Sequence, residues 1–303
     1  MIQDDAQSRK NESAVFGPNG PLMFDALRSI VRDLDHAPVH YEFTSIEEHT
    51  KLFKQDLAAG QRVWATEILY HAHFASVATL VRAYRWAEGC LSAYSSGLFL
   101  PFCASARGLL ESVGDSYVSL VRVPQALCHI RENLRSNLAS NRPPIICDYK
   151  PVEDLLLHFS HARRPTRAER GTLPEYAIAK ESAEYTKAIE HLVPGGFADW
   201  YKELCGYTHP ADQSIGYMLL QADDGRRVQF VPSTDRECLA IHLENHQARL
   251  EELLRVAQVP AMVLLRVLLH FDLPQLHIKA VADLNMTGLP YWKQCAAVLG
   301  VEP

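Results

Sequence analysis

Several common signatures of chemistry are missing from this sequence of 303 residues. It has no Gly-x-Gly-x-x-Gly, no Walker-type loop and no Gly-x-Ser-x-Gly elbow, which excludes the nucleotide-binding and hydrolase families that carry these motifs. Its seven cysteines are odd in number and never form a Cys-x-x-Cys pair, so neither a disulfide framework nor a structural zinc site is expected. We therefore expect no cofactor, no metal and a reducing cytoplasm.

A long apolar run and a secretion signal are also missing. The most apolar stretch, VPAMVLLRVLLHF, is too short for a membrane span and carries Arg266 in its middle. The first residues, MIQDDAQSRKNES, place acids where a signal peptide needs bases. The net charge of -6 gives no reason to expect strong non-specific binding to nucleic acid or to an anionic membrane. These features predict a cytoplasmic protein without a membrane partner.

Apolar residues at helical spacing fill most of the chain, which predicts an all-α fold, a multi-helix bundle. Residues 1–20 are polar and end in a turn, so we expect a flexible N-terminal arm followed by one helical domain over 21–303. Thr44 or Ser45, followed by Glu47 and Glu48, has the spacing of a capped helix N-terminus. The expected helices cover 22–34, 45–60, 61–94, 98–121, 125–138, 152–160, 176–192, 196–207 and 234–270.

One inserted β-hairpin is expected near residues 215–231. Alternating residues flank Asp224-Gly225, a dipeptide that favours the positive φ angles of a tight hairpin turn. With this pair at the tip, Leu219 faces Phe230.

Three charged residues mark one face of the helix expected over 98–121. Arg107, Glu111 and Asp115 are spaced four residues apart, so they share that face. A parallel stripe of small residues would let a neighbouring helix approach closely, and buried charges at such a contact need partners. The stripe consists of Ala104, Gly108, Ser112 and Ser116.

A second polar group follows the helix expected over 196–207. Pro210 disfavours the α conformation at His209, so the helix should end near Thr208 and leave carbonyls that need donors. Tyr207, Thr208 and His209 are candidate partners for the charged face. Two interpretations stay open: a hydrogen-bonded network that fixes helix register, or a polar pocket with His209 as acid, base or phosphate contact.

The segments RGLLES (107–112) and YKELCGYTHPADQS (201–214) resemble the signature of a loosely defined group of bacterial helical proteins. Its members carry an Arg-x-x-x-Glu helix and, about a hundred residues later, a Tyr-x-x-Leu element followed by His-Pro. This group is similar to the HEPN superfamily of helical bundles, many of which serve in phage defence and toxin systems. The resemblance covers about residues 60–215 and implies an α-helical bundle more firmly than an activity.

HEPN ribonucleases usually present an arginine and a histidine separated by four to six intervening residues, and two segments match. They are Arg122 with His129 and Arg236 with His242, of which the second has the more polar context. Such matches also arise by chance in a chain with this many arginines and histidines. In HLENH (242–246) two histidines share a helix face, but the glutamate stands at the third position, so this is not the zincin motif.

A basic segment completes the candidate sites. Nine basic and five acidic residues lie between 122 and 170, and RNA could contact the arginines 163, 164, 167 and 170, although no aromatic residues are interleaved there. The leading hypothesis is a HEPN-like binding or regulatory component, acting in defence against phage. The alternatives are a metal-independent ribonuclease that uses His209, Arg236 or His242, and a non-catalytic assembly protein. The partner would be a protein or a second copy of the chain.

Overall fold

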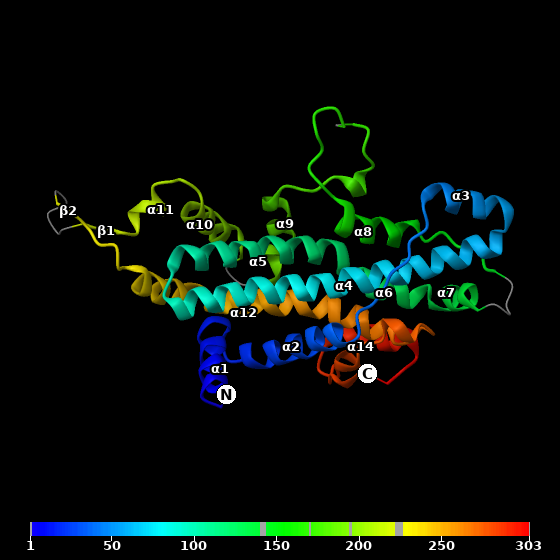
Figure 1. The fold of residues 1–303 in the computed structure, drawn as a ribbon, viewed down its shortest axis with the longest axis horizontal. Coiled ribbons are helices and arrows are strands. Elements are labelled where there is room, and N and C mark those ends of the chain that lie inside the picture. The colour runs from blue at the N-terminus through cyan, green and yellow to red at the C-terminus, as the bar shows by residue number, and fades with distance from the viewer. Residues whose placement is uncertain (1, 140–143, 170, 194–195, 222–226, 303) are drawn as a thin grey trace. The chain divides into compact units, whose positions relative to one another are not determined.

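Helices make up most of the chain, and the structure is a helical bundle with one inserted hairpin, as predicted (Figure 1). The computed structural model describes residues 2–139, 144–169, 171–193, 196–221 and 227–302. No helix in these ranges is long and apolar enough to cross a membrane. The chain, predicted as one domain after an arm, divides into two compact units: residues 1–27, 80–117 and 181–257 form unit 1, and 28–79, 118–180 and 258–303 form unit 2.

Four helices contribute residues to both units: α2 (Gly20–His36), α4 (Leu57–Ser96), α5 (Phe99–Leu120) and α12 (Asp235–Leu268). Unit 1 adds α1 (Ile2–Phe16), α9 (Ser182–Ile189), η2 (Glu190–Leu192), α10 (Ala198–Thr208), α11 (Gln213–Gly216), β1 (Leu219–Gln221) and β2 (Val228–Phe230). Unit 2 adds α3 (Ile46–Gln55), α6 (Val123–His129), α7 (Arg131–Leu138), α8 (Lys150–His161), η1 (Glu175–Ala177), η3 (Pro274–Leu276), α13 (Lys279–Asp283) and α14 (Pro290–Leu299).

The N-terminal residues expected as an arm form helix α1 instead. Its last turn buries Val15 and Phe16, and Phe16 packs against Phe24 of α2 with ring centroids 5.3 Å apart. Gln247 of α12 donates hydrogen bonds of 3.1 and 2.6 Å to the carbonyls of Ser13 and Ala14. A helix end needs donors for its last carbonyls, and here α12 supplies them, which sequence periodicity could not indicate.

In unit 1, α4 and α5 approach closely where small residues were noted. A Cβ added at Gly108 would lie 2.7 Å from the Trp86 ring, and one added at Gly89 would lie 2.8 Å from the Ser105 hydroxyl. Gly97, with φ of +67°, supplies the left-handed conformation that turns the chain between the two helices. Three members of the predicted stripe lie in this contact, since Ser112 and Ser116 also accept hydrogen bonds from Arg82 of α4, whereas Ala104 is exposed.

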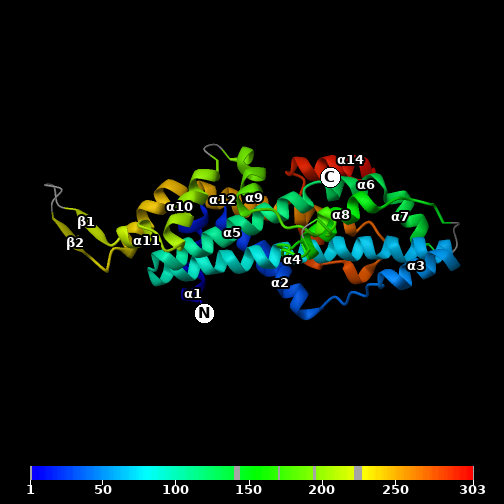
Figure 2. The same cartoon turned by 90° about the horizontal axis from the view of Figure 1, so that it is seen from above.

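The hairpin has the predicted register, with Leu219 opposite Phe230 and Gln221 opposite Val228. The expected turn at Asp224-Gly225 lies outside the described residues. Apolar side chains of both strands are exposed, and both views show the strands extending away from the helices of unit 1 (Figures 1 and 2).

Three expected helices differ from those observed. The helix expected over 45–60 ends at Gln55, because Asp56 is extended, and residues 57–60 belong to α4. The helix expected over 125–138 is split into α6 and α7 at Ile130, whose backbone (φ -95°, ψ 8°) leaves the helical region. The helix expected over 176–192 begins only at Ser182. Before it, in unit 2, Arg163 pairs with the segment around Ile178, donating to the Ala177 carbonyl and accepting from the Ala179 amide. These bonds occupy groups that a continuous helix would need.

Candidate functional site

The strongest candidate site joins α5 to the end of α10 within unit 1. Arg107 donates from Nε to Glu111 Oε1 at 2.9 Å and from Nη1 to Thr208 Oγ1 at 3.0 Å. A further contact of 3.0 Å joins Arg107 Nη1 to His209 Nε2. The Tyr201 hydroxyl donates to Glu111 Oε1 at 3.0 Å. The two segments that carry the family resemblance are thus hydrogen-bonded to each other.

The guanidinium fixes the tautomer of His209. A guanidinium can only donate, so His209 Nε2 accepts and the ring proton of the neutral imidazole lies on Nδ1. Among the described residues, neither His209 Nδ1 nor Arg107 Nη2 has a hydrogen-bond partner, and His209 is exposed. The cluster therefore has two donor nitrogens, Arg107 Nη2 and His209 Nδ1, that no other group in the described chain uses.

Two features fix the groups around Arg107. The first is the burial of Tyr201, and the second is the end of α10 at Thr208. Burial raises the pKa of Tyr201 to about 12, so its hydroxyl stays protonated and continues to donate to Glu111. Thr208 donates to the Leu204 carbonyl at 2.8 Å, and α10 ends there because His209 precedes Pro210 and is extended, with ψ of 158°. The proline thus places the imidazole beyond the helix, as predicted, where it meets Arg107.

Two residues expected in this site lie elsewhere. Asp115 accepts from Arg82 Nη2 of α4 at 2.7 Å, and Arg82 also donates to the Ser112 carbonyl and the Ser116 hydroxyl. The Tyr207 ring packs edge-on against Phe99 at 4.8 Å. The structure brings together Arg107, Glu111 and His209 of the predicted set, without Asp115 and Tyr207.

Tyr201 is the site residue that sequence reasoning did not select. It precedes Thr208 by two helical turns, so both lie on one face of α10, whereas Tyr207 lies about 100° away. The seven-residue spacing between Tyr201 and Thr208 is the sequence feature that could have identified Tyr201 as a site residue.

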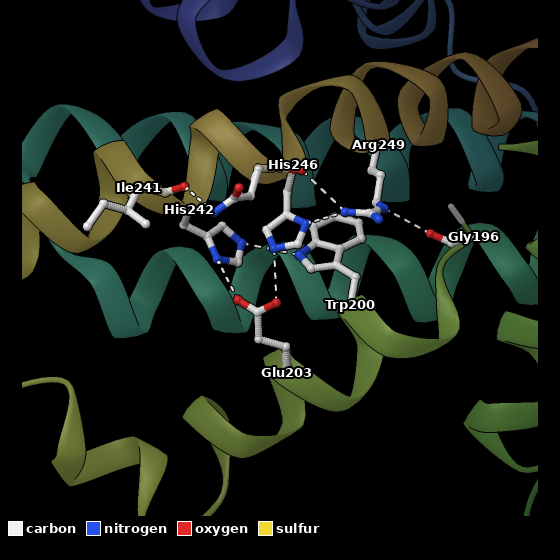
Figure 3. Close-up of polar contacts among 8 residues, drawn as sticks. Gly196, Trp200, Glu203, Ile241, His242, His246 and Arg249 are labelled. Carbon is white, nitrogen blue, oxygen red and sulfur yellow. Dashed lines mark hydrogen bonds and ion pairs between the residues drawn. The ribbon is translucent and has the colours of Figure 1, made fainter. Parts of the chain in front are cut away.

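A second polar network lies between α10 and α12 of unit 1 (Figure 3). His246 Nε2 is 2.9 Å and His242 Nδ1 is 3.2 Å from the two oxygens of Glu203. Trp200 Nε1 donates to His242 Nε2 at 3.2 Å. Arg249 donates from Nη1 to His246 Nδ1 at 2.7 Å and from Nε to the Gly196 carbonyl at 2.9 Å (Figure 3).

These contacts assign a donor or acceptor role to each ring nitrogen of His242 and His246. The Trp200 and Arg249 groups can only donate, so each histidine accepts from them and donates its own N–H to Glu203. The hydrogen bonds from His242 and His246 lower the pKa of Glu203 to about 2. Burial lowers the pKa of His242. The network is complete with an ionised Glu203 and two neutral imidazoles.

The same three residues are the one group of His, Cys, Asp and Glu in the described ranges whose ligand atoms lie close enough for a metal, within 4.8 Å of one another. A histidine that binds a metal normally donates its other ring N–H to an acceptor. Here both outer nitrogens face donors, from Trp200 and Arg249. The surroundings suit the proton network and do not fit a metal ion.

The ribonuclease pair predicted on α12 does not converge. Arg236 is exposed and lies against Gly97, whereas His242 is 3% exposed and has both ring nitrogens engaged in the network. Six residues turn a helix by about 240°, which places the two side chains on different faces.

The predicted RNA-contacting arginines lie in unit 2, between α8 and η1. Arg163 forms a two-pronged ion pair with Glu169, including a contact of 2.8 Å from Nη1. Arg164 and Arg167 are exposed, and Arg170 lies outside the described residues. Glu169 pairs with the guanidinium of Arg163, and an RNA phosphate would therefore have to displace this ion pair to contact Arg163.

Comparison with known proteins identifies no counterpart of these sites. No family model, no curated protein and no solved structure matches this chain.

Proposed function

We propose that this protein is a HEPN-like binding component whose site at Arg107 and His209 holds a phosphate group of its ligand. The observation that carries the proposal is the pair of N–H groups, Arg107 Nη2 and His209 Nδ1, that have no partner among the described residues. Hydrogen bonds from charged donors to phosphate are among the stronger ones in proteins. The donors are held in place by Glu111, Thr208 and Tyr201, none of which bonds to Arg107 Nη2 or His209 Nδ1.

Binding fits this geometry better than ribonuclease chemistry does. A general base needs an unbonded basic nitrogen within reach of the hydroxyl it deprotonates. His209 Nε2 is occupied by Arg107, and His242 is buried with both nitrogens bonded. Neither His209 nor His242 therefore has an unbonded basic nitrogen that could deprotonate a ligand. The proposed role in phage defence rests on the resemblance to the HEPN superfamily alone.

The test is binding of two phosphate probes by the full chain in the presence of EDTA. Fluorescence anisotropy follows a labelled single-stranded RNA, and isothermal titration calorimetry follows ATP, so the two arms separate a polymer from a free nucleotide. Arg107→Gln removes the charge and the guanidinium donors and leaves a shorter polar side chain. We expect it to weaken binding about tenfold or more, the usual cost of losing a charge-assisted hydrogen bond.

A matched control removes a similar charge elsewhere in unit 1. Arg255 of α12 pairs with Glu252 three residues before it, as Arg107 pairs with Glu111. Arg255→Gln should keep wild-type affinity for both probes. Equal losses in the two variants would show only a general effect of charge, and no binding by the wild type would refute the phosphate site.

The exposed hairpin favours a second candidate function, assembly with a second copy of this chain. Leu219, Leu220, Val228 and Phe230 are each 41 to 59% exposed, and two strands alone are marginally stable in water. If two copies are related by a two-fold axis, the same open strand edge of each hairpin pairs with that of the other copy. The two hairpins then form a four-stranded sheet without any other protein. Light scattering after size exclusion should report a dimer for the wild type and a monomer for Leu220→Glu with Phe230→Glu. The control Ile241→Glu, at an exposed apolar position on α12, should stay dimeric.

A further inference from the structure

An open cavity of about 550 Å³ lies in unit 2, between the end of α2 and the segment that runs from η3 into α13. This volume is within the range of about 300 to 1,000 Å³ that is usual for pockets that bind small molecules. Part of the wall is apolar, and five titratable side chains also line the cavity: Asp33, His36, His40, His277 and Lys279. The cavity thus combines an apolar surface with several polar groups.

Hydrogen bonds between separate elements hold the two sides of the cavity. Asp33 of α2 accepts from the backbone N–H of Ala280 at 2.7 Å through Oδ2, which joins α2 to α13. Gln275 of η3 donates from Nε2 to the Tyr70 hydroxyl of α4 at 3.4 Å. The cavity is therefore bounded by elements that are fastened to one another and to the long helix α4.

Two histidines of the cavity have one ring nitrogen committed to a backbone carbonyl. His36 Nδ1 is 2.7 Å from the Arg32 carbonyl, one turn back in α2, and His277 Nε2 is 3.2 Å from the Phe271 carbonyl. A carbonyl can only accept, so in each neutral ring this nitrogen donates. The other nitrogens, His36 Nε2 and His277 Nδ1, each keep a lone pair and have no hydrogen-bond partner among the described residues. They can accept hydrogen bonds from a ligand.

Two opposite charges line the same cavity without pairing with each other. Within the described ranges, Asp33 Oδ1 has no hydrogen-bond partner, and the exposed Lys279 forms no ion pair. Asp33 and His36 are three residues apart on α2, so they lie on one helix face. The acceptors do not gather closely enough for a metal ion, because the one such group in the described ranges lies in unit 1. The cavity therefore offers acceptors on α2 and a separate positive group on α13.

A ligand with both charges suits this arrangement better than a ligand with one. An anion without an ammonium group would face the carboxylate of Asp33, and an amine without a carboxylate would face the ammonium of Lys279. Each of these ligands would be repelled by one charged group of the wall. A zwitterion can pair with both groups, and hydrogen bonds between charged partners are stronger than those between neutral ones.

We propose that this cavity binds a free amino acid with an aliphatic side chain. The α-ammonium group donates to Asp33 Oδ1 and His36 Nε2, and the α-carboxylate accepts from Lys279. The aliphatic side chain packs against the apolar part of the wall, to which Leu34, Val39 and Ile278 contribute. This site belongs to unit 2 and is independent of the phosphate site proposed in unit 1.

The test measures the binding of L-leucine to the full chain by isothermal titration calorimetry near neutral pH. Two relatives of leucine each lack one charge: N-acetyl-L-leucine has no ammonium group, and 3-methylbutylamine has no carboxylate. We expect saturable binding of leucine and binding of each relative that is weaker by about tenfold or more, the usual cost of losing a charge-assisted hydrogen bond. No binding of leucine, or equal binding of all three compounds, would overturn the proposal.

Variants with matched controls locate the site. Asp33→Asn removes the negative charge and keeps an oxygen that can accept from Ala280, and Lys279→Gln removes the positive charge at an exposed position. Each should weaken leucine binding by about tenfold or more. Lys293→Gln, at an exposed position of α14 outside the cavity, should keep wild-type affinity. Unchanged leucine binding in both cavity variants would overturn the proposal, and circular dichroism confirms that each variant is folded.

A second matched pair tests the imidazole. His129, also exposed in unit 2, has Nδ1 2.7 Å from the Gln125 carbonyl and lies outside the cavity. His36→Ala should weaken leucine binding severalfold, whereas His129→Ala should not, and equal effects would contradict the role of His36. Arg107→Gln should keep leucine affinity, and Asp33→Asn should keep the affinity for ATP. Failure of one proposed site is thereby distinguished from failure of the other.

Discussion

Mild acid should destabilise unit 2 through two histidines that its core keeps neutral. Burial lowers the pKa of both His71 and His73 of α4 from 6.5 to about 4. Both imidazoles therefore stay neutral in the folded chain at about pH 5, whereas in the unfolded chain they take up protons below 6.5. The unfolded state then binds more protons, so the stability contributed at neutral pH is lost as the pH falls from 6.5 towards 4.

The magnitude follows from the size of these shifts. Moving from about pH 7 to about pH 5 costs about 2 kcal/mol for one such histidine. His73 is fully buried and should contribute that amount, while His71 is partly exposed and should contribute less because solvent screens it. The two together should lower the free energy of unfolding by about 3 kcal/mol. The lowered pKa of His242 in unit 1 acts in the same direction.

Urea denaturation at a series of pH values measures this loss. His71→Gln removes one titrating group and should reduce the slope of stability against pH between neutrality and about pH 5. The matched change His129→Gln, at an exposed position of α6, should leave the slope as in the wild type. A free energy of unfolding that stays constant or rises over this range would refute the reasoning.

Three further predictions concern unit 1. Gly108→Ala would place a methyl group 2.7 Å from the Trp86 ring and should cost about 1 to 3 kcal/mol of stability, measured by denaturation, whereas Gly288→Ala, with open space around it, should change little. Glu203→Gln replaces one acceptor oxygen by a donor facing an imidazole N–H, so the melting temperature should fall and the unfolding free energy should drop by about 2 kcal/mol or more. Zinc added to the EDTA-treated wild type should leave its melting temperature unchanged, because both outer histidine nitrogens face donors; a saturable rise would contradict the proton assignment.

Local features of the fold could be predicted wherever the sequence itself contains both partners. A cap at Thr44 or Ser45 was expected at the start of α3, and Ser45 forms a capping box there with Glu48. The hairpin register follows from alternation about one dipeptide, and Pro210 ends α10 near the predicted residue. In each case a short-range steric or hydrogen-bonding rule decides the conformation.

Features that depend on a distant partner could not be predicted. The residues of α1 form a helix whose end is capped by Gln247 of α12. The segment before Ser182 is extended because Arg163 pairs with it. A single sequence does not indicate which helix packs opposite which, and these contacts override local propensity.

The candidate site shows the same limit. Arg107, Glu111 and His209 were selected because spacing and the proline identified them, and they do meet. Asp115 has the same four-residue spacing, but it accepts a hydrogen bond from Arg82 of α4 and therefore lies in the contact between α4 and α5. His242 and His246 were recognised as a pair on one helix face, but their partner Glu203 comes from α10 and could not be chosen without the packing.

The most direct test of the proposed phosphate site observes the imidazole of His209 by nitrogen NMR in protein labelled at histidine. We expect the ring proton of His209 on Nδ1 in the free wild type, and a shift of that resonance on titration with ATP that is lost in Arg107→Gln. A proton on Nε2 in the free protein, or a His209 resonance that does not respond to ATP at any concentration tested, would contradict it.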